Sequence, residues 1–203
     1  MSAAVAGGAA SAAAAEAGIE EFLTRVKQVP ETASDKPPWT GARELDLGVV
    51  PPLLELLDSP EREVARNAKR ALQEVVRHAG RPGAEKSALA MEGYLVEALA
   101  KPSTASRADL IWLLSEIGGR RSIPVLTRFL NNAELREHAR CALIRIPGDS
   151  SAAALRTAWN KAEGVWKSAL AEALRARGFR VPPTDKLKPV AQTGVKPKPA
   201  SSQ

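Results

Sequence analysis

The stretch VVPPLLELLDSPEREVARNAKRALQEV, residues 49–75, decides the fold of this chain. Its apolar side chains recur at three- and four-residue spacing on both sides of Ser59-Pro60, which is the spacing of one helix face. Ser59 can cap the segment that follows, and Pro60 suits the first position of a helix. The stretch therefore predicts a helical hairpin, that is, two helices joined by a tight turn.

Three further segments, residues 93–119, 122–148 and 151–178, repeat this pattern. In each second helix an anchor residue is followed by small or apolar residues four, seven and eight positions later, so that they share one face. The four sets are Val64, Ala68, Ala71, Leu72; Ser106, Leu110, Leu113, Leu114; Leu135, Ala139, Ala142, Leu143; and Trp166, Leu170, Ala173, Leu174. Since successive anchors are 42, 29 and 31 residues apart, we expect about four stacked hairpins with an insertion near residues 80 to 92.

The flanks of the hairpin region differ from it in composition. Residues 1–17 are rich in Ala and Gly and predict a flexible leader, whereas the apolar spacing from Ile19 to Val26 predicts one extra helix over residues 18–29. Residues 181–203 are rich in Pro and Lys and predict a disordered basic tail. The expected organisation is therefore a leader, a repeat domain over residues 18–180, and a tail.

Composition favours an all-α fold, because the apolar residues are mostly Ala and Leu and only eight of the 203 residues are aromatic. The single cysteine, Cys141, cannot form an intramolecular disulfide, which favours a reducing compartment. The first 18 residues fit neither a secretory signal nor a membrane span. We therefore expect a cytoplasmic protein without membrane insertion.

The third hairpin carries the clearest family pattern. It reads Ile123-Pro124-Val125-Leu126, then Leu135-Arg136, Ala139, Ala142, Leu143 and Ile146. This pattern resembles the HEAT-like repeats, including the short bacterial form first associated with phycobilisome lyases. The resemblance covers about residues 45 to 178, with Ala65 in the first hairpin where the family usually has Arg. It implies a right-handed, armadillo-like α-solenoid whose second helices line a concave side.

Residues that could carry catalysis are few and scattered. His78 and His138 fall in different hairpins, and the pair Glu137-His138 reverses the His-Glu order of HEAT-repeat hydroxylases. Cys141 is expected on the small-residue packing face, where a free cysteine behaves as a small hydrophobe. Gly118-Gly119 is interpreted as a connection between repeats and not as a phosphate loop. We therefore assign no catalytic residue, no metal site and no cofactor.

Charge is distributed unevenly along the chain. Residues 1–75 carry 8 basic and 12 acidic side chains, whereas residues 120–183 carry 12 basic and 5 acidic ones. The favoured interpretation is solvated helix faces, with Arg107 and Arg136 as structural arginines that pair between neighbouring repeats. The alternative is an electrostatic surface for nucleic acid or an acidic protein.

Two enzyme-related alternatives follow from the same resemblance. HEAT-like alkylpurine DNA glycosylases combine tryptophans with a catalytic Asp, and this chain has Trp112, Trp159 and Trp166. However, the residue that shares the helix face of Trp112 is Glu116 and not the expected Asp. Asp109 lies three residues before Trp112. A phycobilisome-lyase-like accessory role is the other alternative, and no particular residue supports it.

The sequence thus predicts a non-catalytic HEAT-repeat scaffold or adaptor that binds a macromolecular partner through its curved helical surface. A protein partner is favoured, nucleic acid at the basic C-terminal half stays as the alternative, and the oligomeric state is left open. The candidate contacts are the exposed residues of the second helices, namely Arg62, Arg66, Lys69, Arg70, Arg107, Arg136, Glu137, Arg140 and Arg175.

Overall fold

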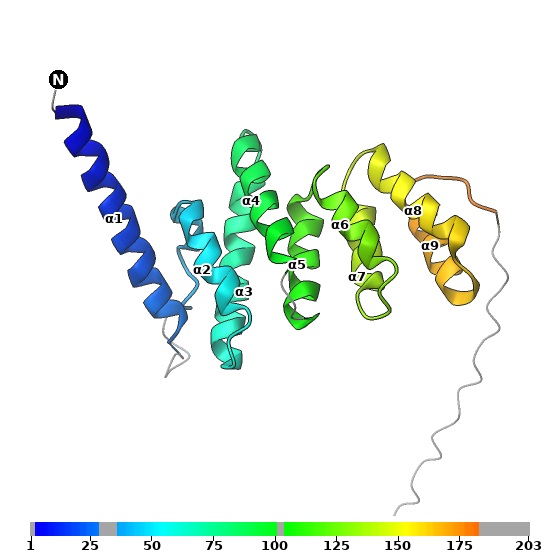
Figure 1. Cartoon of the computed structure of the whole chain (residues 1–203), viewed down its shortest axis with the longest axis horizontal. Coiled ribbons are helices and arrows are strands. Elements are labelled where there is room, and N and C mark those ends of the chain that lie inside the picture. The colour runs from blue at the N-terminus through cyan, green and yellow to red at the C-terminus, as the bar shows by residue number, and fades with distance from the viewer. Residues whose placement is uncertain (1–2, 29–35, 101–103, 183–203) are drawn as a thin grey trace, which may run out of the picture.

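A computed structural model describes residues 3–28, 36–100 and 104–182 of the chain (Figure 1). Within these ranges every regular element is a helix and no strand occurs, which confirms the all-α prediction. The elements are α1 (Ala3–Val26), η1 (Ala42–Glu44), η2 (Leu47–Val49), α2 (Val50–Leu56), α3 (Arg62–Ala79), α4 (Glu85–Ala98), α5 (Thr104–Ile117), α6 (Ser122–Phe129), α7 (Arg136–Arg145), α8 (Asp149–Lys161) and α9 (Gly164–Ala176). Most of the tail predicted from residue 181, residues 183–203, lies outside the described residues.

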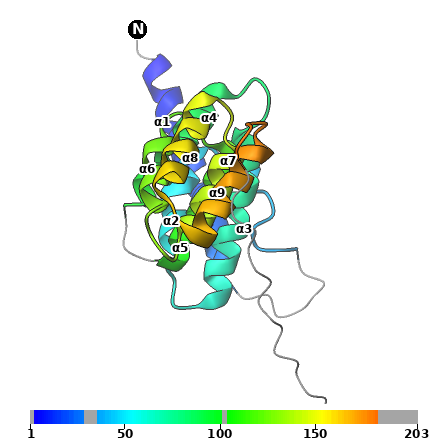
Figure 2. The ribbon, with the colours of Figure 1, turned by 90° about the vertical axis from the view of Figure 1, so that its right-hand side faces the viewer.

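The helices from α2 onward pack in pairs that follow one another along the long axis of the molecule (Figure 1). The helix α2 packs against α3, α4 against α5, α6 against α7, and α8 against α9. Contacts also run from α3 to α5, α7 and α9 in turn, and in parallel from α2 to α4, α6 and α8. Figure 2, viewed from the α9 end, shows α6 and α8 on one side and α7 and α9 on the other.

The core consists mainly of the small and aliphatic side chains that the sequence pattern selects. Of the sixteen residues predicted to form the buried faces of the second helices, fifteen are buried, including Ala68, Leu114 and Leu143 at 0% exposure. Alanines at these positions let neighbouring helices approach closely, and leucines fill the remaining space. Trp166 is the exception and is only half-buried. Apolar periodicity therefore predicted the core correctly in nearly all positions.

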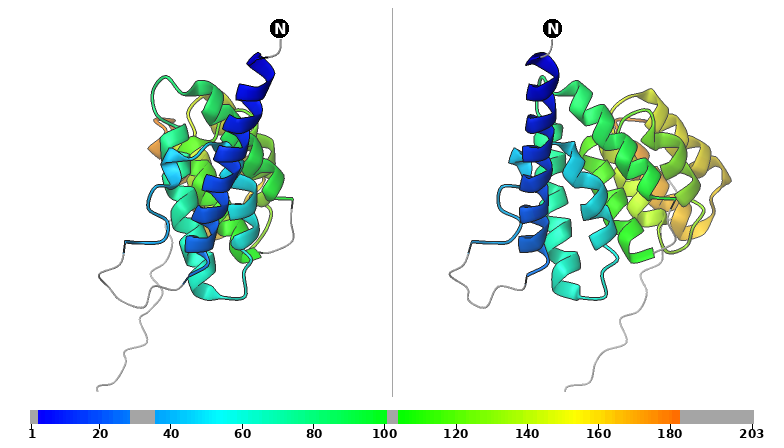
Figure 3. Two further views of the ribbon diagram at one scale, coloured as in Figure 1. Left: turned by 90° about the vertical axis from the view of Figure 1, so that its left-hand side faces the viewer. Right: turned by 60° about the vertical axis from the view of Figure 1, so that its left-hand side comes forward.

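The first helix is longer at its N-terminal side than the sequence predicts. It begins at Ala3, well before residue 18, and it ends at Val26, three residues before 29. Alanine has the highest intrinsic helix propensity, so an Ala-rich segment can be helical without an apolar stripe. Phe22 and Val26 are buried in the core, whereas the N-terminal part of α1 extends beyond the other helices (Figure 3).

The insertion expected near residues 80 to 92 is divided between two helices. It begins just after α3 ends at Ala79, forms a turn with Gly83 at a φ of 82°, and continues as the first turns of α4. A positive φ is readily adopted by glycine, which has no Cβ. The insertion thus lengthens α4, the first helix of the second pair, and does not form a separate long loop.

Several helix ends are capped by side chains from neighbouring helices. The Glu92 carboxylate on α4, 4% exposed, accepts hydrogen bonds from the Gly119 N–H at 2.7 Å, the Ser122 N–H at 2.9 Å and the Ser122 hydroxyl at 2.7 Å. Arg177 donates to the carbonyls of Ile144 at 3.1 Å and Ile146 at 2.5 Å, at the end of α7. Helix ends leave N–H and C=O groups without intrahelical partners, so these contacts fix the start of α6 to α4 and the end of α7 to the end of α9.

Candidate functional site

The nine predicted contact residues all lie on α3, α5, α7 and α9, and we call the solvent-accessible side chains of these four helices the second-helix face. Five of the nine residues are exposed and four are half-buried. The exposed ones are Arg62, Arg66, Arg70, Arg136 and Glu137, and the half-buried ones are Lys69, Arg107, Arg140 and Arg175. The four helices contact one another in sequence, so the face is continuous from α3 to α9.

Ion pairs connect neighbouring helices across this face. Lys69 on α3 donates to the Asp109 carboxylate on α5, with the nitrogen and oxygen 2.6 Å apart. Glu116 on α5 pairs with Arg77 of α3 at 3.2 Å and with Arg145 of α7 at 3.8 Å. The Glu116 side chain is only 17% exposed, so its carboxylate is less screened by water than a fully exposed one. A single carboxylate thereby connects three successive helices.

Other charged residues of the face pair within their own helix. Arg66 pairs with Glu63, Arg140 with Glu137, and Arg175 with Glu172, each three residues apart. Residues at this spacing are neighbours on a helix surface, and such pairs stabilise the helix weakly. Of the nine predicted residues, Glu137 and Arg140 are thus joined to each other directly. The pairing leaves much of the face charge-balanced.

The Glu137–Arg140 pair changes the pKa values of both groups. The hydrogen bond donated by Arg140 is the main reason that the pKa of the Glu137 carboxyl lies below its ordinary value, and burial opposes this effect. The same hydrogen bond raises the pKa of the Arg140 guanidinium, again against the effect of burial. Both groups are therefore held in their charged forms.

Two tryptophans lie among these charges. The guanidinium of Arg77 lies 6.0 Å from the ring centre of Trp112 on the neighbouring helix. Arg136, which we expected to pair with a neighbouring repeat, lies 4.9 Å from the ring centre of Trp166 on α9. A cation over an aromatic face is attracted by the ring quadrupole. Both rings are half-buried, so each combines a fixed position with a surface that a partner can reach.

Sequence reasoning missed the residues that connect the helices, namely Arg77, Asp109, Glu116 and Arg145 as a paired set. Asp109 and Glu116 were considered only as carboxylates for base chemistry, and the structure places both in ion pairs. Their seven-residue spacing puts them on one helix face, and Lys69 and Arg77 have a similar spacing on α3. That matched spacing was a usable signal for pairing between the two helices.

Comparison with known proteins gives no family. No protein-family model matches the sequence, and no curated protein matches it. The function therefore has to be argued from the residues of the face.

Cys141 does not lie on the packing face where we expected it, since its side chain is exposed on α7. The buried stripe of this helix runs through Ala139, Ala142 and Leu143, and Cys141 lies outside it. The Arg140 guanidinium lies 3.6 Å from its sulfur. The burial prediction for this residue was wrong because the cysteine was grouped with its neighbours in sequence and not with its helix face.

Among the described residues, no group of three or more His, Cys, Asp or Glu side chains could hold a metal ion. In the same ranges, no helix is long and apolar enough to cross a membrane. His78 and His138 lie exposed on α3 and α7, respectively. The clearest feature of the second-helix face is thus its network of charged and aromatic side chains.

Proposed function

We propose that this chain is a non-catalytic HEAT-repeat scaffold or adaptor, a right-handed α-solenoid of about four helical hairpins that binds a protein through its second-helix face. The pairwise packing of α2 to α9 and the buried alanine and leucine positions support this proposal. The single cysteine fits a reducing compartment, and we include a cytoplasmic location in the proposal.

The observation that carries the proposal is the set of ion pairs between helices on this face. Lys69, Arg77 and Arg145 each pair with a carboxylate of α5, so the motion of their side chains is restricted before a partner binds. Binding then costs less side-chain entropy than it would on a surface of freely rotating side chains. A preorganised face with accessible Arg and Trp residues has the composition of protein interfaces.

The same pairs favour a protein over nucleic acid as the partner of this face. Binding that is dominated by phosphate contacts needs Lys and Arg side chains that can release small counterions and bind phosphates in their place. Here Arg66, Lys69 and Arg140 already have carboxylate partners on the protein itself. A surface that carries both positive and negative side chains is complementary to another surface that carries both. A protein partner provides such a surface, whereas the backbone of a nucleic acid carries only negative charge.

The proposal is tested with two charge-reversal variants of the full chain. The face variant is Arg62→Glu with Arg70→Glu, because both side chains are exposed and form no ion pair with other described residues. The matched control is Arg128→Glu with Lys161→Glu, two exposed residues of α6 and α8 that lie outside the second-helix face and also form no ion pair within the described ranges. Both variants change the net charge equally.

Proteins that the wild-type chain captures are identified, purified and titrated against each variant. We expect the face variant to bind its partner at least about tenfold more weakly, because like charges brought together in an interface are strongly unfavourable. The control should bind like the wild type. A purified partner that binds both variants equally, or that is lost only with the control, would contradict the proposal.

A further inference from the structure

The last three helices carry a row of cations stacked on aromatic rings. Arg136 lies 4.9 Å from the ring centre of Trp166, Lys167 lies 5.4 Å from that of Trp159, and Arg156 lies 5.1 Å from that of Phe179. Trp166 and Lys167 are adjacent on α9, and Arg156 and Trp159 are three residues apart on α8. The three pairs therefore join α7 to α9, α9 to α8, and α8 to the residues after α9, and we call these six side chains the cation–aromatic belt.

The cations of this belt differ from those of the ion pairs described above. None of the three forms an ion pair with a carboxylate in the described ranges, in contrast to Lys69 and Arg145 on the second-helix face. Arg136 and Arg156 are exposed, and Lys167 is half-buried. One side of each cation covers an aromatic ring, and the other side is free to contact a ligand. The belt can therefore bind an anion without first breaking an ion pair.

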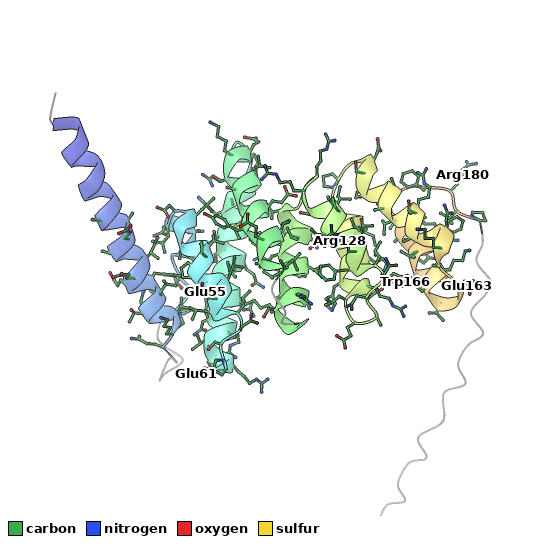
Figure 4. All side chains as sticks on the ribbon, in the orientation of Figure 1. Glu55, Glu61, Arg128, Glu163, Trp166 and Arg180 are labelled. Carbon is green, nitrogen blue, oxygen red and sulfur yellow. The ribbon has the colours of Figure 1, made fainter. Side chains whose placement is uncertain are left out.

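Other cations in the C-terminal half of the chain add positive charge. Arg128 and Arg180 are exposed and form no ion pair with other described residues. Figure 4 shows Trp166 in the lower part of α9 and Arg180 beyond the opposite end of this helix. Residues 120–183 carry 12 basic and 5 acidic side chains in total. A large excess of one charge sign concentrates ligands of the opposite sign near the surface.

We propose that the cation–aromatic belt binds single-stranded nucleic acid. Two chemical features together favour this ligand: cations that can contact successive phosphates, and flat groups on which bases can stack. A guanidinium stacked on a ring leaves its second face open, and bases stack on arginine planes as well as on aromatic rings. A duplex buries its base faces, and an acidic peptide has none. The belt shares Arg136, Trp166 and Lys167 with the second-helix face, but Arg156, Trp159 and Phe179 lie outside that face. Nucleic acid is also a different partner from a protein, so this proposal goes beyond the proposed function.

The first experiment measures binding of the full chain to a labelled oligothymidylate of about 15 nucleotides, close to the site size of compact single-strand binders. A duplex of the same length and a polyglutamate of the same charge serve as competitors. We expect the single strand to bind best, with affinity falling as salt rises from about 50 to 200 mM. Its binding should also quench tryptophan fluorescence, because bases stacking beside Trp159 and Trp166 change the surroundings of both rings.

The second experiment compares two variants that lose the same charge. The belt variant is Arg156→Gln with Lys167→Gln, and the control is Arg62→Gln with Arg70→Gln on α3. Since each phosphate contact of a single strand contributes about 0.7 to the salt slope, the belt variant should lose about 1.4 from it and bind about tenfold more weakly. The control should change by less than about twofold.

A further variant with all four tail lysines, Lys186, Lys188, Lys196 and Lys198, changed to Gln separates the belt from the basic C-terminal sequence. It should retain the preference for the single strand. Equal binding of the duplex, equal competition by polyglutamate, or equal weakening in the α3 control would overturn the proposal. Because thermal unfolding of each variant is measured in parallel and the wild-type fluorescence needs no variant, loss of folding cannot imitate these outcomes.

Discussion

The carboxylate of Glu116 lies between two arginines of different helices, with Arg77 of α3 at 3.2 Å and Arg145 of α7 at 3.8 Å. The two arginine side chains are 62% and 55% exposed, so water weakens each pair. Arg145 also donates to the Ser115 carbonyl at 3.3 Å, near the end of α5. The carboxylate thus joins three helices that are neighbours in space but far apart in sequence.

Glu116→Gln should lower the free energy of unfolding by about 0.5 to 1.5 kcal/mol, because exposed ion pairs contribute up to about 1 kcal/mol each. Urea unfolding at low and at high salt measures this loss, which should shrink as salt screens the charges. Glu55→Gln on α2 is the control, since its side chain is exposed and forms no ion pair with other described residues. A loss that does not depend on salt would show that packing, and not charge, accounts for the effect.

A second prediction concerns the buried cap of α6. Glu92→Leu removes both carboxylate oxygens, so the Gly119 and Ser122 donors lose Oε1, the atom that accepts all three of their hydrogen bonds. Hydrogen bonds to charged groups contribute about 1.5 to 3 kcal/mol each, and buried donors left without a partner add a further cost. We expect a loss of about 2 to 4 kcal/mol in urea unfolding.

Glu97→Leu, on the same helix and exposed, is the matched control and should change the free energy of unfolding by less than about 0.5 kcal/mol. Similar losses in both variants would mean that Glu92 does not act as a cap. Gly119→Ala should also destabilise the protein, because a Cβ at this position would meet the Glu92 carboxylate at 3.3 Å.

The pairing of Glu137 with Arg140 predicts a small dependence of stability on pH. Because the pKa of Glu137 is lower in the folded chain than its ordinary value, the pair contributes stability above that ordinary value. This contribution is lost as the pH falls through the folded pKa. The Glu137 side chain is 59% exposed, so we expect less than about 0.5 kcal/mol from the pair.

The measurement is the difference in unfolding free energy between the wild type and Glu137→Gln, followed from pH 7 to about pH 3. The difference should be largest at neutral pH and should disappear in acid. A difference that stays constant over this range would show that the carboxylate charge of Glu137 is not involved. Glu134→Gln is the control, because Glu134 is exposed and forms no ion pair with other described residues.

Local periodicity predicted the all-α class and the buried helix faces because the buried face of each second helix is a property of that helix alone. The positions of Val64, Leu114 and Leu143 followed from spacing, and all three are buried. The ion pairs could not be predicted in the same way, since they depend on how far one helix is shifted along its neighbour. Asp109 and Glu116 were visible as carboxylates, but their partners on α3 and α7 follow only from the packing of the helices.

The remaining differences have local causes. The start of α1 at Ala3 shows that alanine propensity can form a helix where no apolar stripe exists. Trp166 occupies an anchor position but stays half-buried, because a ring is too large for a position that elsewhere holds Val, Ser or Leu. The nine candidate residues were assigned to helices correctly, whereas their role in binding remains a prediction.

The last prediction concerns the attachment of α1 to the other helices. Asn67 on α3 is 1% exposed, and its side-chain amide donates to the carbonyls of Val26 at 3.1 Å and Gln28 at 3.3 Å. Asn67→Asp keeps the volume but replaces the donor with an acceptor, and it places negative charge beside the carbonyl end of α1. We expect a loss of about 2 to 3 kcal/mol in urea unfolding at neutral pH.

Part of that loss should be recovered near pH 4, where a buried aspartic acid becomes neutral and can donate again. Hydrogen exchange locates the effect: amides of Phe22 to Val26 should exchange faster, while those of α7 should not change. Asn160→Asp on α8, which is exposed, is the control. If exchange in Asn67→Asp rises equally in α1 and α7, then Asn67 stabilises the whole chain, and α1 is not separately anchored by its amide.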